Sequence, residues 1–397
     1  PLLASRKKRW IFMVSLAVTL LASMSLFYTK SVAVKMLPFD NKNEFQVVID
    51  MPEGTTLEKT NAVSREIGQY LSQQKLVRNY QSYVGTPGPI SFNGLVRHYD
   101  LRSGENVADI QVNLLEKKDR SLQSHGIVKQ MRPDIIAIGK KYNANVKLVE
   151  IPPGPPVLST LVAEIYGPDY DQQIRVARQV KALMDSTADV VDVDWMVEDD
   201  HPEYHFEIDK EKAMRNGIAP AQIVATMNAA LSGMNAGTLY QPASFDPVNI
   251  KLQLSDANKS GLSDLKNINI IGQQGNAVPV SDLVTVTKKI KEKSIYRKNQ
   301  KRVVFVLADM AGDLESPSYA MSNMSEKLGN IKLPAGYTLN EEYTQQPETE
   351  DHFSLKWDGE WQITYEVFRD LGIAFAVVIL IIYMLIVGWF QDFKVPL

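Results

Sequence analysis

Two long apolar runs without charge, one near each end, constrain the fold of this chain most. The first extends from Trp10 to Tyr28 and the second from Leu371 to Phe390. A helix of about 20 predominantly apolar residues crosses the hydrocarbon core of a bilayer. A helix in a water-soluble core is rarely apolar on every face over such a length. The sequence therefore predicts two transmembrane helices with a large region between them.

Basic residues set the orientation of the first apolar run. Arg6, Lys7, Lys8 and Arg9 come directly before it, and basic residues beside a span are retained in the cytoplasm. The alternative, a cleaved signal peptide, has a shorter apolar region and a small-residue cleavage site. Two spans return the chain to its starting side, so we expect the region between them to lie outside the cytoplasm.

Composition and motifs exclude several classes of function. A net charge of -3 on 397 residues gives no sign of a nucleic-acid-binding protein. The absence of cysteine excludes disulfides and thiolate metal sites. Gly139-Lys140-Lys141 lacks the upstream glycine and the following hydroxyl of a P-loop, so we expect no ATP hydrolysis. The chain starts at Pro1 and stops at Leu397, and we interpret it as a segment of a longer polypeptide.

The region between the spans begins with a βαββαβ pattern, which is the order of a ferredoxin-like unit. Thr55 followed by Glu58 forms a capping box that predicts the start of the first helix. Pro133 is expected to kink or split the second helix. The predicted elements are a strand at 45–50, a helix from 55, strands at 77–84 and 107–115, a helix at 122–142 and a strand at 145–150.

A second copy of the pattern follows a proline-rich linker at 151–157, and this copy is interrupted. Its elements are a strand at 161–166, a helix at 171–186, a strand at 190–195, and later a strand at 302–307, a helix at 318–328 and a strand at 337–342. The residues in between carry strands of their own and a helix that begins at Pro220. We therefore predict a subdomain inserted into the second unit.

The predicted fold is α+β, with two ferredoxin-like units, the second interrupted by an α+β subdomain, between two transmembrane helices. Trp357, Trp361, Tyr365 and Phe368 recur at helix-like spacing, which predicts an amphipathic helix at the membrane interface; the alternative is a helix that caps the domain. The predicted boundaries are 1–36 for the first membrane helix, 37–151 for the first unit, 152–198 with 302–345 for the second unit, 199–301 for the insert, 346–370 for the interfacial helix and 371–397 for the second membrane helix.

Five segments, in order along the chain, carry a resemblance to a known family. They are Leu37-Pro38-Phe39-Asp40-Asn41, Met51-Pro52-Glu53-Gly54-Thr55-Thr56, Phe206 to Ala213 with Gly217-Ile218, Ala277 to Leu283, and Trp361 to Asp370. On these segments the chain resembles the C-terminal half of a resistance-nodulation-division (RND) efflux permease of the hydrophobe/amphiphile (acriflavine-resistance) type. The resemblance implies that 37–151 and the interrupted unit are porter subdomains and that 199–301 is a docking subdomain.

The resemblance also implies a function and partners. It implies a proton-driven antiporter of a Gram-negative inner membrane, largely periplasmic in this segment, without enzymatic activity or cofactor. Expected partners are small hydrophobic or amphiphilic substrates, further copies in a homotrimer, a periplasmic adaptor, an outer-membrane channel and membrane lipid. Neither apolar run carries an ionisable residue, so proton-relay residues are expected elsewhere in the permease. Two alternatives stay open: a metal- or lipid-exporting RND member, and a two-span receptor with an extracytoplasmic sensor domain.

One irregular loop is the candidate substrate path. The stretch from Tyr83 to Arg102 is rich in glycine and proline, and long loops of this kind are often functional. The resemblance gives the matching loop a phenylalanine that contacts substrate. Pro87, Gly88, Pro89 and Phe92 are therefore the candidate residues, and the alternative is an ordinary surface loop.

No metal site is predicted from the histidines or methionines. His201 and His205 are four residues apart, which suits a metal site on a helix, but Pro202 intervenes and the following residues alternate like a strand. The methionines are scattered, which argues against a copper or silver cargo. No catalytic residue is predicted either.

Overall fold

The computed structural model describes residues 5–29, 31, 39–151, 154, 156–242, 244–312 and 315–394. The chain divides into two compact parts, one made of Pro1–Asp199 with Lys293–Leu397 and the other of Asp200–Glu292. The second part is called the inserted unit below, and each part is described by itself. Leu37 and Pro38 of the first matching segment, and three prolines of the predicted linker (152, 153 and 155), lie outside the described residues.

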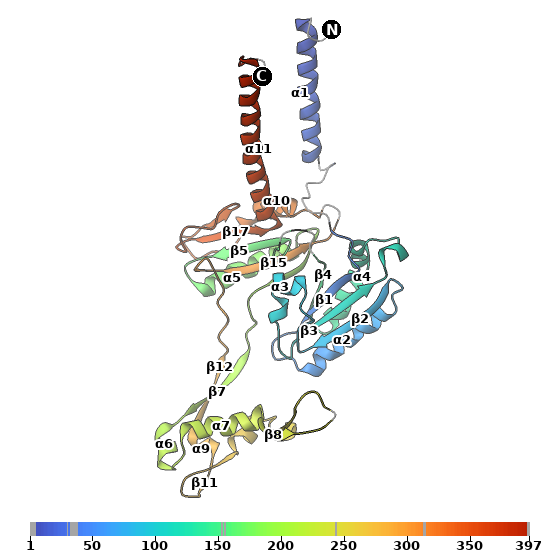
Figure 1. The fold of residues 1–397 in the computed structure, drawn as a ribbon. Coiled ribbons are helices and arrows are strands. Elements are labelled where there is room, and N and C mark those ends of the chain that lie inside the picture. Colours follow the sequence, from blue (N-terminus) through green and yellow to red (C-terminus); the bar gives the residue numbers. More distant parts are fainter. Residues whose placement is uncertain are drawn as a thin grey trace. The chain divides into compact units, whose positions relative to one another are not determined.

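The first α/β unit contains a four-stranded antiparallel sheet with the order β2-β3-β1-β4. Its main elements are β1 (Glu44–Asp50), α2 (Leu57–Ser72), β2 (Val77–Val84), β3 (Val107–Leu114), α4 (Ser124–Lys141) and β4 (Asn145–Val149). Both helices cover one face of the sheet, where Ile67 and Ile135 pack among the apolar strand residues (Figure 1). The predicted ferredoxin-like topology is observed.

Two local predictions for these helices are wrong. Helix α2 starts at Leu57, and the residue before it, Thr56, makes no side-chain cap. The hydroxyl of Thr55, the residue of the predicted capping box, donates back to the Pro52 carbonyl at 2.6 Å. Helix α4 continues unbroken through Pro133. Pro133 lies on the exposed side of α4, where the carbonyl that loses its backbone donor is accessible to solvent, so the helix tolerates the proline.

The second α/β unit repeats this topology around the insertion. Its elements are β5 (Leu161–Tyr166), α5 (Tyr170–Asp185), β6 (Val190–Trp195), β15 (Val304–Met310), α10 (Pro317–Leu328) and β16 (Leu339–Glu342). Strand β15, which follows the insertion, lies between β5 and β6 and is antiparallel to both. The chain therefore returns to the sheet that it left.

One strand of the second unit was not predicted. Strand β17 (Phe353–Gly359) lies between β16 and β5, parallel to the first and antiparallel to the second. The predicted interfacial helix at 346–370 is therefore wrong over its first half. The four-residue spacing of Trp357 and Trp361 looked helical, but Phe353, Leu355 and Trp357 alternate with polar residues, and all three are buried in the core.

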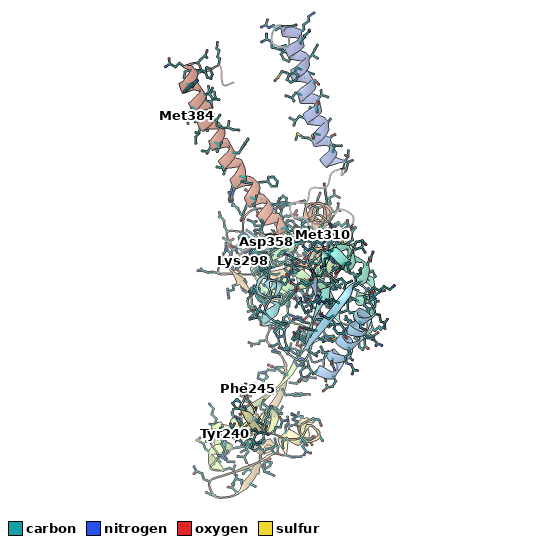
Figure 2. The ribbon with its side chains drawn as sticks, turned by 45° about the vertical axis from the view of Figure 1, so that its right-hand side comes forward. Tyr240, Phe245, Lys298, Met310, Asp358 and Met384 are labelled. Carbon is teal, nitrogen blue, oxygen red and sulfur yellow. The ribbon has the colours of Figure 1, made fainter. Side chains whose placement is uncertain are left out.

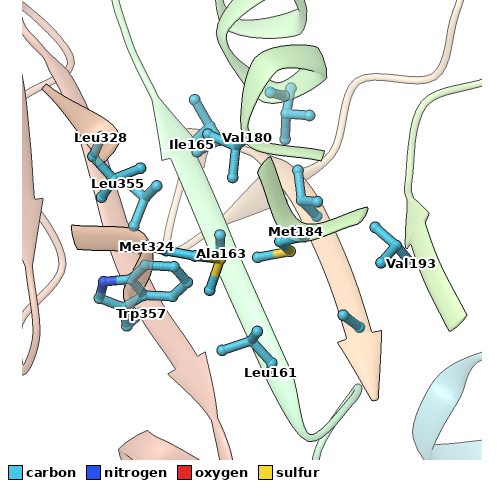
Figure 3. Close-up of a cluster of buried hydrophobic side chains, with 14 of the residues drawn as sticks. Leu161, Ala163, Ile165, Val180, Met184, Val193, Met324, Leu328, Leu355 and Trp357 are labelled. Carbon is cyan, nitrogen blue, oxygen red and sulfur yellow. The ribbon is translucent and has the colours of Figure 1, made fainter. Parts of the chain in front are cut away.

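The core of the second unit is built differently from that of the first. Trp357 is fully buried beside Leu355, and its indole N–H donates to Glu341 Oε1 at 2.6 Å. Met184 and Met324 approach the small side chain of Ala163 (Figure 3). Unbranched methionines fill irregular space between a sheet and its helices.

The inserted unit is a small α+β body. Its longer elements are β7 (Pro202–Ile208), α6 (Lys210–Arg215), α7 (Pro220–Leu231), β8 (Met234–Leu239), β9 (Val248–Leu252), α8 (Leu262–Lys266), β10 (Asn269–Ile271), β11 (Ala277–Pro279), α9 (Val280–Leu283) and β12 (Val284–Ile290). Three antiparallel ribbons pair β7 with β12, β8 with β9, and β10 with β11. Ile223, Ile270 and Leu283 lie in its core, whereas Tyr240 and Phe245, between β8 and β9, are exposed (Figure 2).

Among the residues that the structure describes, two helices are long and apolar enough to cross a membrane. They are α1 (Arg6–Tyr28) and α11 (Glu360–Phe390), and their apolar windows are unburied within the chain. Helix α11 contains the second predicted span. It starts at Glu360, directly after β17 ends at Gly359. The sheet of the second unit thus leads into an apolar helix without an intervening loop.

Candidate functional site

The candidate loop after β2 is an ordered structure. Gly85 leaves the strand with φ +78°, a backbone conformation that favours glycine. Ser91 then caps a short helix, α3 (Phe92–Arg97), by accepting a hydrogen bond from the Gly94 amide at 3.1 Å. A 3₁₀ turn, η1 (Tyr99–Leu101), completes the excursion before β3.

The candidate residues of this loop have two different environments. The Gly88 amide, between Pro87 and Pro89, donates to Asp109 Oδ2 on β3 at 2.9 Å, so this segment is attached to the sheet. Phe92 starts α3 with 45% of its surface exposed. Phe92 is therefore accessible to a ligand, whereas Gly88 and its flanking prolines have a structural role.

Phe92 belongs to a group of exposed apolar side chains in the same loop. Ile90, Leu95 and Leu101 are each more than half exposed. Phe92 and Leu95 are three residues apart on one short helix, a spacing that places side chains on the same face. We call Ile90, Phe92, Leu95 and Leu101 the apolar loop group.

The opposite end of α3 holds the two α/β units together. Arg97 is buried and donates to both carboxylate oxygens of Asp309 on β15, at 2.6 and 3.2 Å. Asp309 also accepts from the Ser159 hydroxyl at 2.8 Å and from the Thr160 amide at 3.0 Å. Burial alone would raise the pKa of Asp309, but Arg97 and these donors hold it well below its ordinary value.

A second cluster attaches the loop to the first sheet. Arg102 donates to Asp109 Oδ1 at 2.7 Å and to the Ile49 carbonyl at 2.8 Å, and it also pairs with Asp50. Lys147 on β4 donates to Asp50 Oδ2 at 2.7 Å. Burial opposes ionisation of Asp50, yet Lys147 and Arg102 lower its pKa to about 2.

In every ion pair that the structure describes between the two units, the charges are distributed in the same direction. The first unit supplies the cations and the second unit supplies the carboxylates. The pairs are Arg97 with Asp309, Lys147 with Asp194, Arg132 with Asp192, and His125 and Lys129 with Glu315. Such complementarity fixes the register of two surfaces and penalises other arrangements. We call these pairs the inter-unit ion pairs.

His125 lies between two carboxylates within this set. Its Nδ1 is 2.6 Å from Glu150 Oε2 and its Nε2 is 2.8 Å from Glu315 Oε1. Its ring stacks on Phe39 at a centroid distance of 3.9 Å. Burial lowers the pKa of His125, but the two carboxylates outweigh burial and raise it. The His125 ring therefore lies between a carboxylate of its own unit and one of the other unit, an arrangement that favours its protonated form.

Sequence reasoning missed these ionic contacts. Arg97 and Asp309 are 212 positions apart, and neither belongs to a recognisable motif. The one available signal was an arginine at the end of an apolar loop helix.

The residues that the structure describes contain no group of three or more His, Cys, Asp or Glu side chains arranged for a metal ion. His205 Nε2 pairs with Glu203 at 2.5 Å along β7, and the His201 carbonyl accepts from the Lys291 amide at 2.8 Å. His205 thus lies within β7, and His201 lies directly before its first residue, Pro202.

Comparison with known proteins places this architecture in a family. The model of the AcrB/AcrD/AcrF family matches residues 2–397. The chain belongs to that family. The AcrB/AcrD/AcrF proteins are RND efflux permeases of the inner membrane, which are transporters, so the resemblance of the sequence to RND permeases is confirmed at the level of the family.

Individual relatives are metal-resistance proteins. The cobalt-zinc-cadmium resistance protein CzcA of Cupriavidus metallidurans is 21% identical over 244 residues, which are 60% of this chain and 21% of CzcA. The nickel and cobalt resistance protein CnrA of the same organism is 24% identical over 186 residues, 45% of this chain and 17% of CnrA. This AcrB/AcrD/AcrF chain thus spans about a fifth of these relatives. The names of these relatives refer to heavy metals, so they do not support the predicted hydrophobe/amphiphile subtype.

Solved structures show the same fold. A heavy metal efflux pump in one crystal form superimposes with a TM-score of 0.73 at 14% identity, covering 97% of this chain and 37% of that pump. A second crystal form gives a TM-score of 0.71 at 16% identity, with 94% and 36% covered. At this identity the likeness concerns the fold, which agrees with the predicted α+β architecture between two apolar helices.

Proposed function

We propose that this chain forms the porter and docking portion of a proton-driven RND efflux permease. The observation that carries the proposal is the pair of ferredoxin-like units, the second interrupted by the inserted unit, in a chain of this family. In this proposal residues 37–151 and 152–198 with 302–345 are the porter subdomains, and 199–301 is the docking subdomain. Strand β17, within 346–370, belongs with the second porter subdomain.

The proposal includes a location and partners. Helices α1 and α11 hold the segment in a Gram-negative inner membrane, with the sheets and the inserted unit in the periplasm. The complete permease assembles as a homotrimer with a periplasmic adaptor and an outer-membrane channel. Support comes from the two apolar helices and from the family.

The first candidate substrate is a divalent heavy-metal cation. The names of the relatives support it, since CzcA and CnrA are resistance proteins for cobalt, zinc, cadmium and nickel. The segments that resemble this chain make up about a fifth of those proteins. We therefore propose that the remainder of the permease contributes the metal ligands.

The second candidate substrate is a small hydrophobic or amphiphilic molecule. The apolar loop group supports it, because Ile90 and Phe92 expose apolar surface beside the contact between the two α/β units. Exposed apolar side chains that gather in one place often bind apolar ligands. In this case Phe92 contacts substrate, while Gly88 and its flanking prolines hold the loop on β3.

The test uses the full-length permease in a host that lacks its own RND pumps. Growth is measured against cobalt, zinc, cadmium and nickel salts, and against amphiphilic dyes. Protection from the metals alone, unchanged by Phe92→Ala, supports the first candidate. Dye efflux that Phe92→Ala reduces while the exposed control Leu122→Ala preserves it supports the second. A permease that is correctly inserted and protects against neither class contradicts the proposal.

A further inference from the structure

A small cavity lies within the contact between the two α/β units. Its volume is about 20 Å³, and its lining comes from both units. The first unit contributes Arg97, Arg132 and Glu150, and the second unit contributes Thr160 and Asp309. The cavity therefore lies among the inter-unit ion pairs.

Three polar atoms at this cavity are buried and have no hydrogen-bond partner among the residues that the structure describes. They are Arg97 Nε, Arg132 Nε and Glu150 Oε1. Seven such side-chain atoms occur in the described part of the chain, and three of them belong to residues that line this one cavity. Buried polar groups are nearly always hydrogen-bonded, and a cluster of exceptions indicates a ligand.

The remaining polar atoms of the same side chains are already paired. The Arg97 Nη atoms donate to Asp309, and those of Arg132 donate to Asp192 and to the Leu148 carbonyl. Glu150 Oε2 pairs with His125. Each side chain is therefore fixed in place with one polar atom left for the cavity.

These three atoms are two donors and one acceptor, which is a set that a single water molecule can satisfy. Two guanidinium N–H groups donate to its oxygen, and it donates a hydrogen to the carboxylate oxygen. A metal cation would face two N–H donors, and an anion would face the Glu150 carboxylate. The volume also suits one water, since a cavity needs roughly 10–15 Å³ to hold one.

We propose that this cavity is a binding site for one ordered water, which links Arg97 and Arg132 to Glu150. The water completes the hydrogen bonding of the joint between the units. If the units separate, bulk water replaces it at the same three atoms, so no polar group is left unpaired.

The test is a structure of the full-length permease at a resolution that shows ordered water. We expect one peak at hydrogen-bonding distance, about 3 Å, from Arg97 Nε, Arg132 Nε and Glu150 Oε1. Crystals soaked in bromide should show no anomalous peak there. A dry cavity, a bromide peak, or a side chain that fills the site would each overturn the proposal.

Variants test the same site in solution. Glu150→Gln keeps one acceptor oxygen for the water, so the peak should persist, and the melting temperature should fall less than in Glu150→Leu because only the contact with His125 is weakened. Glu150→Leu should lose the peak and lower the melting temperature by several degrees. The same two substitutions at Glu326, on the exposed side of α10, should leave the melting temperature unchanged. Retention of the peak in Glu150→Leu would contradict the assigned acceptor.

Discussion

The two α/β units share a strand order and differ at one place in it. In the first unit β4 lies directly beside β1, whereas in the second unit β17 lies between β16 and β5. The first core contains two buried methionines and the second contains four, together with Trp357. The topology therefore accepts an additional strand next to its first strand, and flexible methionine side chains fill the core around it.

The additional strand also changes how the second unit is attached. Strand β17 passes through Gly359 into α11, while β4 of the first unit is followed by residues of the predicted linker. Because no loop separates β17 from α11, we expect a motion of α11 to act directly on the second sheet. The predictions below test whether β17 has this mechanical role.

The largest effect is expected for Trp357→Ala. Removing a fully buried tryptophan should cost roughly 3–5 kcal/mol of unfolding free energy, by lost burial and a cavity. The variant should also free β17, so limited proteolysis of the full-length permease should cleave between β16 and α11. Phe45→Ala in β1 is the matched control, since Phe45 is equally buried and should lower the melting temperature without exposing that cleavage site. Cleavage in neither variant would show that β17 is not the weak point of the second unit.

A slightly smaller effect is expected for Arg97→Ala. Removing one partner of a buried ion pair leaves Asp309 unpaired and should cost about 3 kcal/mol. Replacing both partners, with Arg97→Met and Asp309→Asn together, should recover much of the loss, because the introduced amide carries no charge and keeps an acceptor for the Ser159 hydroxyl or the Thr160 amide. The melting temperature of the purified permease measures the recovery. The control is Glu211→Ala, which removes the partner of Arg215 in an exposed ion pair and should change the free energy of unfolding by less than about 1 kcal/mol. If Arg97→Ala matches this control, the ion pair does not hold the units together.

A third effect tests the junction between β17 and α11. Gly359 has φ +81°, and a Cβ there would lie 2.6 Å from the Ser159 carbonyl oxygen. Gly359→Ala should therefore cost roughly 1–3 kcal/mol. Gly329→Ala, at the end of α10 with φ -60° and open space around it, should be near neutral. Equal melting temperatures for the two variants would contradict a rigid junction.

Most of the fold could be predicted from the periodicity of the chain. Strands β1 and β5 and helix α5 follow simple apolar patterns. The segments before and after the insertion together complete one βαββαβ pattern, which predicts that they share a sheet. Strand β17 was missed because aromatic residues four apart satisfy both a strand and a helix. Only burial of Trp357 in the sheet decides between them.

Less of the candidate site could be predicted. Phe92 and Gly88 follow from the composition of the loop and from the family. The inter-unit ion pairs do not, because they join residues as far apart as Arg97 and Asp309, and charged residues in a sequence are usually solvated. Their partners are set by the packing of two sheets, which local patterns do not encode.

The smallest expected effect, a dependence on pH, separates the buried carboxyl groups of the two units. Glu164 on β5 is fully buried, and burial together with Asp358 on β17 raises its pKa to about 7, despite Lys298 and Lys356 nearby. In the first unit the pKa of Asp50 has the opposite shift, to about 2. Glu164 thus holds a proton in the folded state that the unfolded chain releases near the ordinary glutamate pKa of 4.5.

The sign of each dependence follows from these shifts. The stability that protonated Glu164 contributes is complete below about pH 4.5 and is lost as the pH rises towards 7, so Glu164→Gln should become progressively more stable than the wild type over that interval. Asp50→Asn should behave in reverse: its penalty should be complete above the ordinary aspartate pKa of 3.8 and fade as the pH falls towards 2. Melting temperatures of both variants and the wild type from acidic to neutral pH measure the two slopes. Parallel profiles would mean that the additional strand does not give the second unit a different electrostatic environment, because Asp358 reaches Glu164 only through β17.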